Sequence, residues 1–270
     1  MGDFLDELAA VAWKNVKEGY YRHSGASRPC GRRSLRNAIV ALGGRKAPII
    51  SEIKFASPSA GLLRAPGNIE FIARSMVKAG AVGLSILTEP YYFSGSLENL
   101  LRARMVVETP ILMKDIVVSM EQIETAWKMD ADAILLIVAL FERGYCEASL
   151  NEVIEYSHAH GLEVLLEAHT PEEFKLALST DADMIGINNR DLKTLKVDLS
   201  VTKRILKSFD KSEAGGRPII SESGIRSPGD IRFLRKCGAD AFLVGSSIMT
   251  AKSIIKFISG LVNAYGESES

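Results

Sequence analysis

A carboxylate and an ammonium group stand two residues apart in the segment PIISEIKFASPSAG, residues 48–61. Three isoleucines make the start of this segment typical of a buried strand, and the Ser-Pro-Ser sequence that follows ends it. Side chains alternate between the two faces of a strand, so Glu52 and Lys54 point to the same side. We expect this pair at the carboxyl end of a strand, facing inward toward a site.

Acidic, basic or amide side chains also follow most of the other short apolar runs. The residues concerned, with one aromatic residue from the loop after the second run, are Phe93, Lys114, Asp115, Glu167, His169, Asn188, Arg190, Glu222 and Ser223. A single lysine or glutamate of this kind is usually a surface residue or a partner of the next helix. The strand ends of a barrel converge on one mouth, so the whole set favours one shared site.

Two glycine-containing turns, at residues 223–225 (Ser-Gly-Ile) and 245–247 (Gly-Ser-Ser), follow the last two apolar runs. Barrels often bind phosphate at this place, through backbone N–H groups and the start of a short helix. Glycine is also common in tight turns that bind nothing. Because the two turns follow consecutive strands, we interpret them as a phosphate site.

The residues of this expected site favour general acid–base chemistry on a sugar phosphate. Lys54 and Lys114 would stand among three carboxylates, and such groups can donate and accept protons without a metal. His158 and His160 are two residues apart and so face different sides of a helix, and the sequence predicts no metal centre. The same lysines leave a second mechanism open, a Schiff base with a carbonyl substrate.

These side chains need a parallel sheet to bring them together. Short apolar runs alternate with helix-length amphipathic segments, and the runs cover residues 49–54, 83–87, 111–114, 133–137, 163–167, 184–187, 218–222 and 241–244. Eight such repeats in this length predict an α/β fold, a (β/α)8 TIM barrel. An open doubly wound sheet is the alternative, and the absence of a G-x-G-x-x-G motif after the first run weakens its dinucleotide-binding form.

Capping residues mark where the intervening helices begin and end. Expected first residues are Ser119, Ser149, Thr170 and Ser227, and expected stops are Gly80 and Gly238. Before the first strand, residues 3–18 predict an amphipathic helix and residues 35–42 a short one. The chain is therefore expected to be one domain, 1–270. Residues 1–47 would form a helical extension over the barrel mouth, 48–264 the barrel and 265–270 a flexible tail.

Composition excludes several classes of protein. The 270 residues carry no net formal charge and are 47% hydrophobic and 24% charged, which is typical of a globular chain. The balanced charge argues against nucleic acid as a partner. One basic cluster has no interleaved aromatic residues, so we interpret it as a solvated face or a substrate-side loop. Its members are Arg22, Arg28, Arg32, Arg33 and Arg36.

Cysteine usage and hydrophobic runs predict a reduced, cytoplasmic setting. The three cysteines are widely spaced and form no C-x-x-C pair, which indicates neither a zinc site nor a disulfide framework. The acidic amino-terminal segment lacks the basic region of a secretory signal. The longest apolar run, residues 134–141, is far too short to span a bilayer, so no membrane association is expected.

Seven segments of the chain, in order, resemble the indole-3-glycerol-phosphate synthase family of tryptophan biosynthesis. They are SEIKFASPSAG, SILTEPYYFSGS, MKDIVV, LLEAHT, IGINNRDLKT, IISESGI and FLVGSSIM, spread from about Pro48 to Met249. The resemblance implies a lyase that needs no cofactor. Its substrate would be 1-(2-carboxyphenylamino)-1-deoxyribulose 5-phosphate, which closes to an indole with loss of carbon dioxide and water.

The resemblance also implies roles for individual residues. Lys114 would be the principal general acid, and Glu167 a base or charge stabiliser. Lys54, held by Glu52, would contact the substrate carboxylate and act as an acid in dehydration. Asn188 and Glu222 would bind the sugar hydroxyls, and Arg190 would orient its neighbours or the anthranilate carboxylate. The residues that would contact the phosphate or adjoining substrate atoms are Ser57, Ser223, Gly224, Gly245 and Ser246.

Three positions depart from the usual family pattern, at Met113, Ile116 and Ala168, and two other functions are open. The family commonly has K-D-F where this chain reads Lys114-Asp115-Ile116, so the aromatic wall against the anthranilate ring is either missing or supplied by Phe93. The alternatives are a phosphoribosylanthranilate isomerase-like barrel and a catalytically silent barrel that binds a phosphorylated ligand. We expect a monomer or a weak homodimer, with other tryptophan-pathway enzymes as candidate partners.

Overall fold

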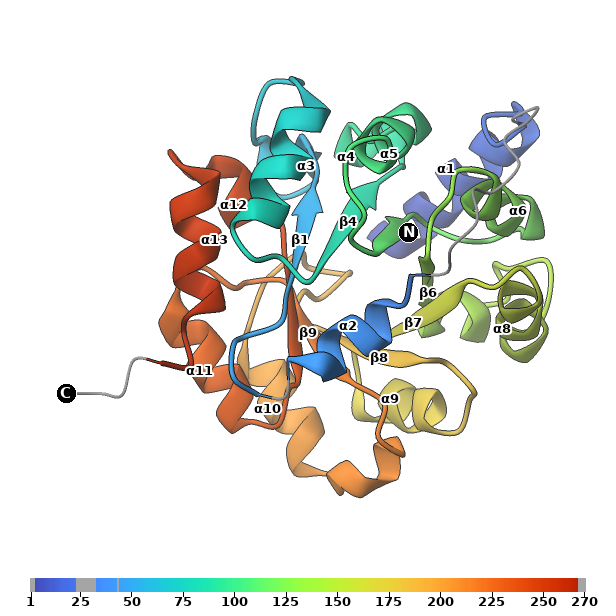
Figure 1. Ribbon diagram of the computed structural model, residues 1–270. Coiled ribbons are helices and arrows are strands. Elements are labelled where there is room, and N and C mark those ends of the chain that lie inside the picture. Colours follow the sequence, from blue (N-terminus) through green and yellow to red (C-terminus); the bar gives the residue numbers. More distant parts are fainter. Residues whose placement is uncertain (1–2, 23–32, 43, 267–270) are drawn as a thin grey trace.

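Eight parallel strands close into a barrel in the computed structural model, which describes residues 3–22, 33–42 and 44–266 (Figure 1). Around the barrel the strands follow the order β1-β10-β9-β8-β7-β6-β5-β4, and β4 pairs with β1. They are β1 (Ile49–Ile53), β4 (Gly83–Leu87), β5 (Ile111–Lys114), β6 (Ala133–Ile137), β7 (Glu163–Ala168), β8 (Met184–Asn188), β9 (Ile219–Glu222) and β10 (Ala241–Val244). Each coincides with a predicted run, so the predicted (β/α)8 barrel is confirmed.

Helices cover the outside of the barrel between consecutive strands, as Figure 1 shows. They are α3 (Ile69–Lys78), α4 (Pro90–Phe93), α5 (Leu97–Arg104), α6 (Met120–Lys128), α7 (Val138–Glu142), α8 (Leu150–Ala159), α9 (Pro171–Leu178), α10 (Ser200–Lys207), η1 (Lys211–Ala214), α11 (Pro228–Lys236), α12 (Ser246–Thr250) and α13 (Ile254–Val262). A short hairpin that the sequence did not predict, β2 (Ala56–Ser57) with β3 (Gly61–Leu62), follows β1.

The predicted caps fix the ends of these helices. Ser119, Ser149 and Ser227 each form a reciprocal capping box, which satisfies two N–H groups that the first helical turn leaves free. Gly80 and Gly238 follow α3 and α11 with φ angles of +99° and +111°, which a residue with a Cβ adopts only with strain. The caps therefore set how each strand passes into the helix beside it.

The first helix of the amino-terminal extension, α1 (Phe4–Lys17), lies at the carboxyl ends of the strands. On one side, Arg143 after α7 pairs with Asp3 and Asp6 at 2.7 Å. On the other side, the ring of Phe4 meets that of Tyr92 in α4 edge to face, with 5.1 Å between centroids. The helix thus bridges the loops that follow β4 and β6.

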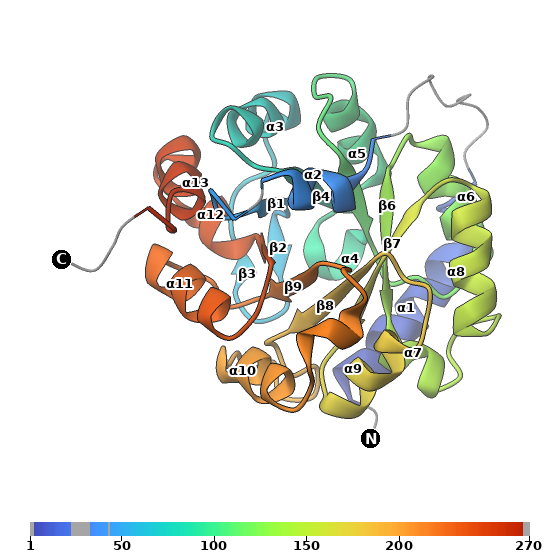
Figure 2. The ribbon, with the colours of Figure 1, turned by 60° about the horizontal axis from the view of Figure 1, so that its bottom comes forward.

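The second helix, α2 (Leu35–Ala41), lies at the opposite end of the barrel. The backbone N–H of Leu35 donates to Glu163 at the start of β7, at 2.7 Å. Its side chain sits over Gly83 at the start of β4, where a Cβ would come within 2.4 Å of it. Figure 2 shows α2 across the near end of the barrel and α1 on the far side. The expectation that residues 1–47 lie over the mouth is therefore wrong for α2, because its free N–H groups bind Glu163.

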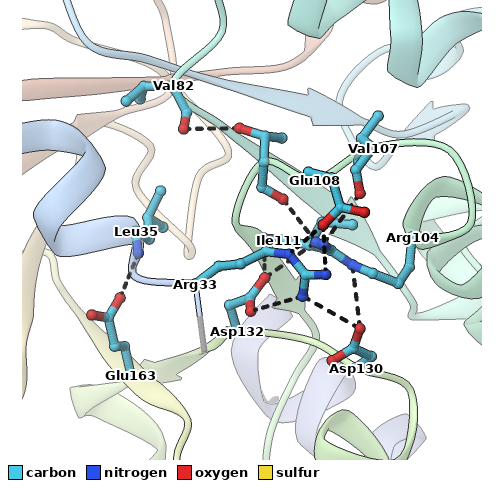
Figure 3. A network of polar contacts seen from close by, with 11 residues as sticks. Arg33, Leu35, Val82, Arg104, Val107, Glu108, Ile111, Asp130, Asp132 and Glu163 are labelled. Carbon is cyan, nitrogen blue, oxygen red and sulfur yellow. Dashed lines mark hydrogen bonds and ion pairs between the residues drawn. The ribbon is translucent and has the colours of Figure 1, made fainter. Parts of the chain in front are cut away.

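An ion-pair network joins the extension to the same end of the barrel (Figure 3). Asp132, just before β6, accepts a hydrogen bond from the backbone of Ile111 in β5 and pairs with Arg104 at 3.1 Å. Arg33 approaches the same carboxylate at 3.7 Å and Asp130 at 3.4 Å. The side chain of Arg33 is only 19% exposed, so the expected solvated or substrate-side role is wrong for this arginine. Arg28 and Arg32 lie outside the described residues.

Candidate active site

A pocket opens at the carboxyl ends of the strands, and all the residues with a predicted role in catalysis or binding line it. Those residues are Glu52, Lys54, Ser57, Phe93, Lys114, Glu167, Asn188, Arg190, Glu222, Ser223, Gly224, Gly245 and Ser246. They come from the carboxyl ends of β1, β5, β7, β8 and β9 and from the segments after β1, β4, β8, β9 and β10. The barrel therefore brings together residues that are up to about two hundred positions apart, as parallel strands require.

Lys114, the last residue of β5, stands between two carboxylates. Its Nζ lies 3.3 Å from Oε2 of Glu167 in β7 and 3.3 Å from Oε2 of Glu222 in β9. Both glutamates are almost fully buried, whereas the lysine side chain keeps 17% exposure toward the pocket. The ammonium thus lies at the centre of the site, with one face free for a ligand.

Charge pairing sets the protonation of this cluster. Burial opposes the charge on Lys114, but Glu167 and Glu222 outweigh it and raise the pKa of the ammonium above its ordinary value. Burial also opposes the charge on Glu167, but Lys114 and His169 hold the pKa of that carboxyl well below its usual range. For Glu222 burial prevails, and the pKa of the carboxyl is raised. Lys114 is therefore a charged donor and Glu167 an ionised acceptor at neutral pH.

The second lysine forms its own pair beside the first cluster. Nζ of Lys54 lies 2.7 Å from Oε1 of Glu52, which is buried at the end of β1. The Glu52 carboxylate fills the space above Gly245, where a Cβ would come within 2.2 Å of Oε1. Glycine is therefore required at this position so that Glu52 can reach Lys54.

Glu167 has two further neighbours that fix its direction. Nδ2 of Asn188 donates to Oε1 of Glu167 at 3.0 Å. His169, two residues along the chain, places Nε2 3.2 Å from the same oxygen. The side-chain oxygen of Asn188 in turn accepts from the backbone N–H of Arg190 at 2.9 Å. The carboxylate is held on several sides while its ion pair with Lys114 faces the pocket.

Arg190 connects two loops at the rim. Its Nη1 donates to the hydroxyl of Ser59, in the loop after β1, and to the carbonyl of Leu195, in the loop after β8. Burial lowers the pKa of the guanidinium, although Glu52 opposes this shift. The arginine lines the pocket while it ties these two loops together.

The apolar side of the pocket includes residues that sequence reasoning did not assign to the site. Phe93, the last residue of α4, lines the pocket as predicted, and Ile116 lines it as well. Phe4 and Leu8 reach the pocket from α1. Their helical spacing within an amphipathic segment was the signal for an inward face, but the pattern does not say which surface that face covers.

Two buried carboxylates at the pocket wall had no individual role predicted from the sequence. Glu89 caps α4 and accepts the backbone N–H groups of three consecutive residues, ending at Phe93. Asp115 accepts from the hydroxyl of Tyr21 at 3.1 Å and from the backbone of Ile116 at 2.7 Å. Burial raises the pKa of Asp115 to about 6, against the hydrogen bonds that it accepts. Both hold neighbouring pocket residues in place.

The two glycine turns lie next to each other at the rim. Ser223 and Gly224 both have positive φ angles, +67° and +86°, and the hydroxyl of Ser247 donates to the carbonyl of Ile225 at 2.6 Å. Gly245 precedes α12, and no side chain caps the N–H groups of that helix. The turns after β9 and β10 are thus tied together, with backbone N–H groups beside the pocket.

The described residues hold neither a metal-binding cluster nor a helix that could span a membrane. In the parts of the chain that the structure describes, no set of three or more His, Cys, Asp or Glu side chains is arranged to hold a metal ion. Within the same ranges, every helix is too short or too polar to cross a membrane.

Solved structures with a similar fold include two other proteins. The chain superposes on the thiamine phosphate pyrophosphorylase from Pyrococcus furiosus with a TM-score of 0.59 and 17% identity, over 86% of this chain and 98% of that one. The N-acetylmannosamine-6-phosphate 2-epimerase from Clostridium perfringens gives a TM-score of 0.57 and 16% identity, over 83% and 93%. At this identity the likeness shows the fold alone.

Sequence comparison is more specific. The family profile described as indole-3-glycerol phosphate synthase matches residues 7–261. The indole-3-glycerol phosphate synthase of Methanocaldococcus jannaschii is 43% identical over 211 residues, 77% of this chain and 75% of the relative. That of Bacillus mycoides is 35% identical over 257 residues, 95% and 97% of the two chains. The protein therefore belongs to the indole-3-glycerol phosphate synthase family.

Proposed function

We propose that the protein closes 1-(2-carboxyphenylamino)-1-deoxyribulose 5-phosphate to indole-3-glycerol phosphate, with loss of carbon dioxide and water. The observation that carries this proposal is the position of Lys114, a charged donor within 3.3 Å of both Glu167 and Glu222 in one pocket. The family membership supports an enzyme of this kind. The proposed steps need one acid for an oxygen atom and one base for a carbon-bound proton.

Lys114 is the proposed acid of the first step. The aromatic carbon that bears the carboxylate attacks the ketone carbon, and the ketone oxygen takes a proton from Nζ. Carbon dioxide then leaves and aromaticity returns. A hydroxyl of the substrate bound to Glu222 would weaken the ion pair between Glu222 and Lys114, and the pKa of the ammonium would fall toward the range where it transfers a proton readily.

Lys54 and Glu167 are proposed for the dehydration. The new hydroxyl takes a second proton and leaves as water, while the carbon next to nitrogen gives up its proton to a base. Two protons are delivered to oxygen and one is removed from carbon. With an ionised substrate carboxylate, each turnover therefore consumes one proton. Lys54, paired with Glu52, is the proposed second acid, and the ionised Glu167 the base.

The remaining contacts are proposed from the lining of the pocket. Arg190 and Lys54 would face the anthranilate carboxylate, Phe93 and Ile116 its ring, and Asn188 and Glu222 the sugar hydroxyls. The phosphate would lie against the turns at Ser223-Gly224 and Gly245-Ser246, with Ser57 beside them. An apolar slot next to a rim of backbone N–H groups matches a molecule with an aromatic end and a phosphate end.

Substitution of Lys114 tests this proposal. In Lys114→Ala we expect kcat/KM to fall by about 100-fold or more, the contribution of a positioned general acid, while the phosphorylated substrate still binds. Turnover is followed by the indole fluorescence, and binding by calorimetry. Lys128→Ala is the matched control, because Lys128 pairs with Glu124 on the surface of α6 at 3.4 Å. A folded Lys114→Ala protein with normal turnover would show that another group is the acid.

A further inference from the structure

A second cluster of charged groups adjoins the site on the side away from the substrate. His169, directly after β7, lies between two carboxylates, with Nε2 3.2 Å from Glu167 and Nδ1 3.3 Å from Glu173 in α9. The histidine side chain and that of Glu173 are each only 11% exposed. Among the described residues, these two carboxylates are the charged groups found against the ring.

We infer that His169 is a positioning residue, a buried imidazolium that keeps Glu167 ionised and aimed at Lys114. The inference rests on the function proposed above, because Glu167 is the base of that reaction. It extends the site by two residues, His169 and Glu173, that do not line the pocket. Charges then alternate along the series Glu173, His169, Glu167 and Lys114, and each of the inner two lies between groups of opposite sign.

Local structure places the ring in this position. Glu173 accepts the backbone N–H of His169 at 2.7 Å, and its own N–H donates to Thr170, the residue that caps α9. The turn from β7 into α9 therefore brings Glu173 back over His169. The other carboxylate is fixed by the strand, since residues 167 and 169 are two positions apart and extend to the same side.

The electrostatic balance supports a charged ring. Burial opposes the charge, but Glu167 and Glu173 prevail and raise the pKa of His169 to about 9. The Nε2–H bond is not directed at Glu167 as a hydrogen bond requires, so their contact is an ion pair. A neutral ring would leave the Glu167 carboxylate with Lys114 and Asn188 as its remaining polar partners among the described residues.

Three variants separate charge from hydrogen bonding. His169→Gln keeps an N–H donor within reach of Glu167 but has no charge. His169→Asn keeps a donor toward Glu173 only. Glu173→Gln preserves the acceptor for the backbone of His169 and removes one negative charge, so the turn into α9 is retained.

Kinetics and histidine titration form the test. In His169→Asn we expect kcat to fall roughly 10-fold, which is less than the loss of the base itself would cause, and KM to change little. The acidic limb of the plot of kcat against pH should move to higher pH, because Glu167 loses a positive neighbour that favours its ionised form. In His169→Gln the fall in kcat should be smaller, because the side chain keeps an N–H donor within reach of Glu167. Nuclear magnetic resonance of the wild-type ring should show a titration midpoint well above that of an ordinary histidine, and Glu173→Gln should lower it.

Each outcome decides a separate point. An unchanged kcat profile in folded His169 variants would overturn the inference and leave the ring as part of a turn. A wild-type ring that is neutral at pH 7 would overturn it as well, and this reading does not depend on turnover. If His169→Asn fails to fold, Glu173→Gln decides through its profile and midpoint. A wild-type protein that makes no indole product would refute the proposed function instead.

Discussion

At the residue scale, the barrel mouth holds charges that would be costly to bury singly. Isolated buried ions lose several kcal/mol of hydration, and well-placed partners of opposite sign offset this loss. Lys114 has two such partners, and Lys54 has Glu52. The arrangement keeps Lys114 charged at the wall of the pocket, where it can donate a proton to a bound substrate. Removal of any one member should therefore change the protonation of the others.

Asp115 gives a pH-dependent prediction at this scale. Its carboxyl has a pKa of about 6 in the folded protein against an ordinary value of 3.8, so the folded state favours the protonated form. This contribution to stability is present at low pH and is lost as pH rises through about 6. Asp115→Asn lacks the titration and keeps an acceptor for Ile116.

We therefore expect the free energy of unfolding of Asp115→Asn, relative to that of the wild type, to increase by about 1.4 kcal/mol between pH 5 and pH 7.5. This is the stability that the wild type loses as the Asp115 carboxyl ionises over that range. Chemical denaturation at the two pH values measures this difference. Equal differences at both pH values would show that the carboxyl titrates normally. Thr88, which also donates to Asp115, is left unchanged in this comparison.

At the scale of elements, helix α1 completes the wall of the pocket. It is held between Arg143 on one side and Tyr92 on the other, while Phe4 and Leu8 turn inward. Tyr21, just beyond this helix, donates to Asp115, next to the proposed acid. The extension therefore contacts the site both through its inner face and through the end of β5.

This position of α1 predicts a defect in substrate binding. Leu8 is 3% exposed and lines the pocket, so Leu8→Ala should raise KM several-fold, as expected for about 1–2 kcal/mol of lost apolar contact, with kcat nearly unchanged. Lys17→Ala, on the exposed face of the same helix, is the control. A larger loss in kcat than in KM would mean that α1 positions the reacting groups as well.

At the scale of the whole molecule, the two ends of the barrel have different tasks. The mouth carries the charged pocket, whereas the opposite end carries α2 and the network of Arg33, Arg104, Asp130 and Asp132 (Figure 3). Residues at that end of a barrel serve stability. The network fastens the extension to the starts of β5 and β6.

Arg33→Met should therefore lower stability and spare activity. We expect a loss of about 1–3 kcal/mol in the free energy of unfolding, since the buried Asp132 loses a cationic neighbour, and an unchanged kcat/KM. Arg102→Met, which breaks a surface pair with Glu70, is the control and should change stability far less. A drop in kcat/KM with normal stability would contradict the separation of the two ends.

The sequence predicts the barrel and most of the site because both follow local rules. Apolar runs of strand length mark the strands, and the polar residues after them must meet at the mouth. The sequence does not predict the position of α2, because that position depends on a hydrogen bond to Glu163, which is more than a hundred residues away along the chain. The sequence did not predict the roles of Glu89 and Asp115 either, since a buried carboxylate and a surface one look alike until their hydrogen-bond donors are known. The same holds for Arg33, which lies in a cluster of arginines.

The most direct test of the proposed reaction measures two products of the wild-type protein at once, carbon dioxide and indole-3-glycerol phosphate. The protein is given the carboxyphenylamino-deoxyribulose phosphate without added metal or cofactor. We expect both products in equal amounts, because decarboxylation and ring closure belong to one reaction in one pocket. Tight binding of the substrate with neither product would contradict it and would indicate a barrel that keeps the ligand site without the chemistry.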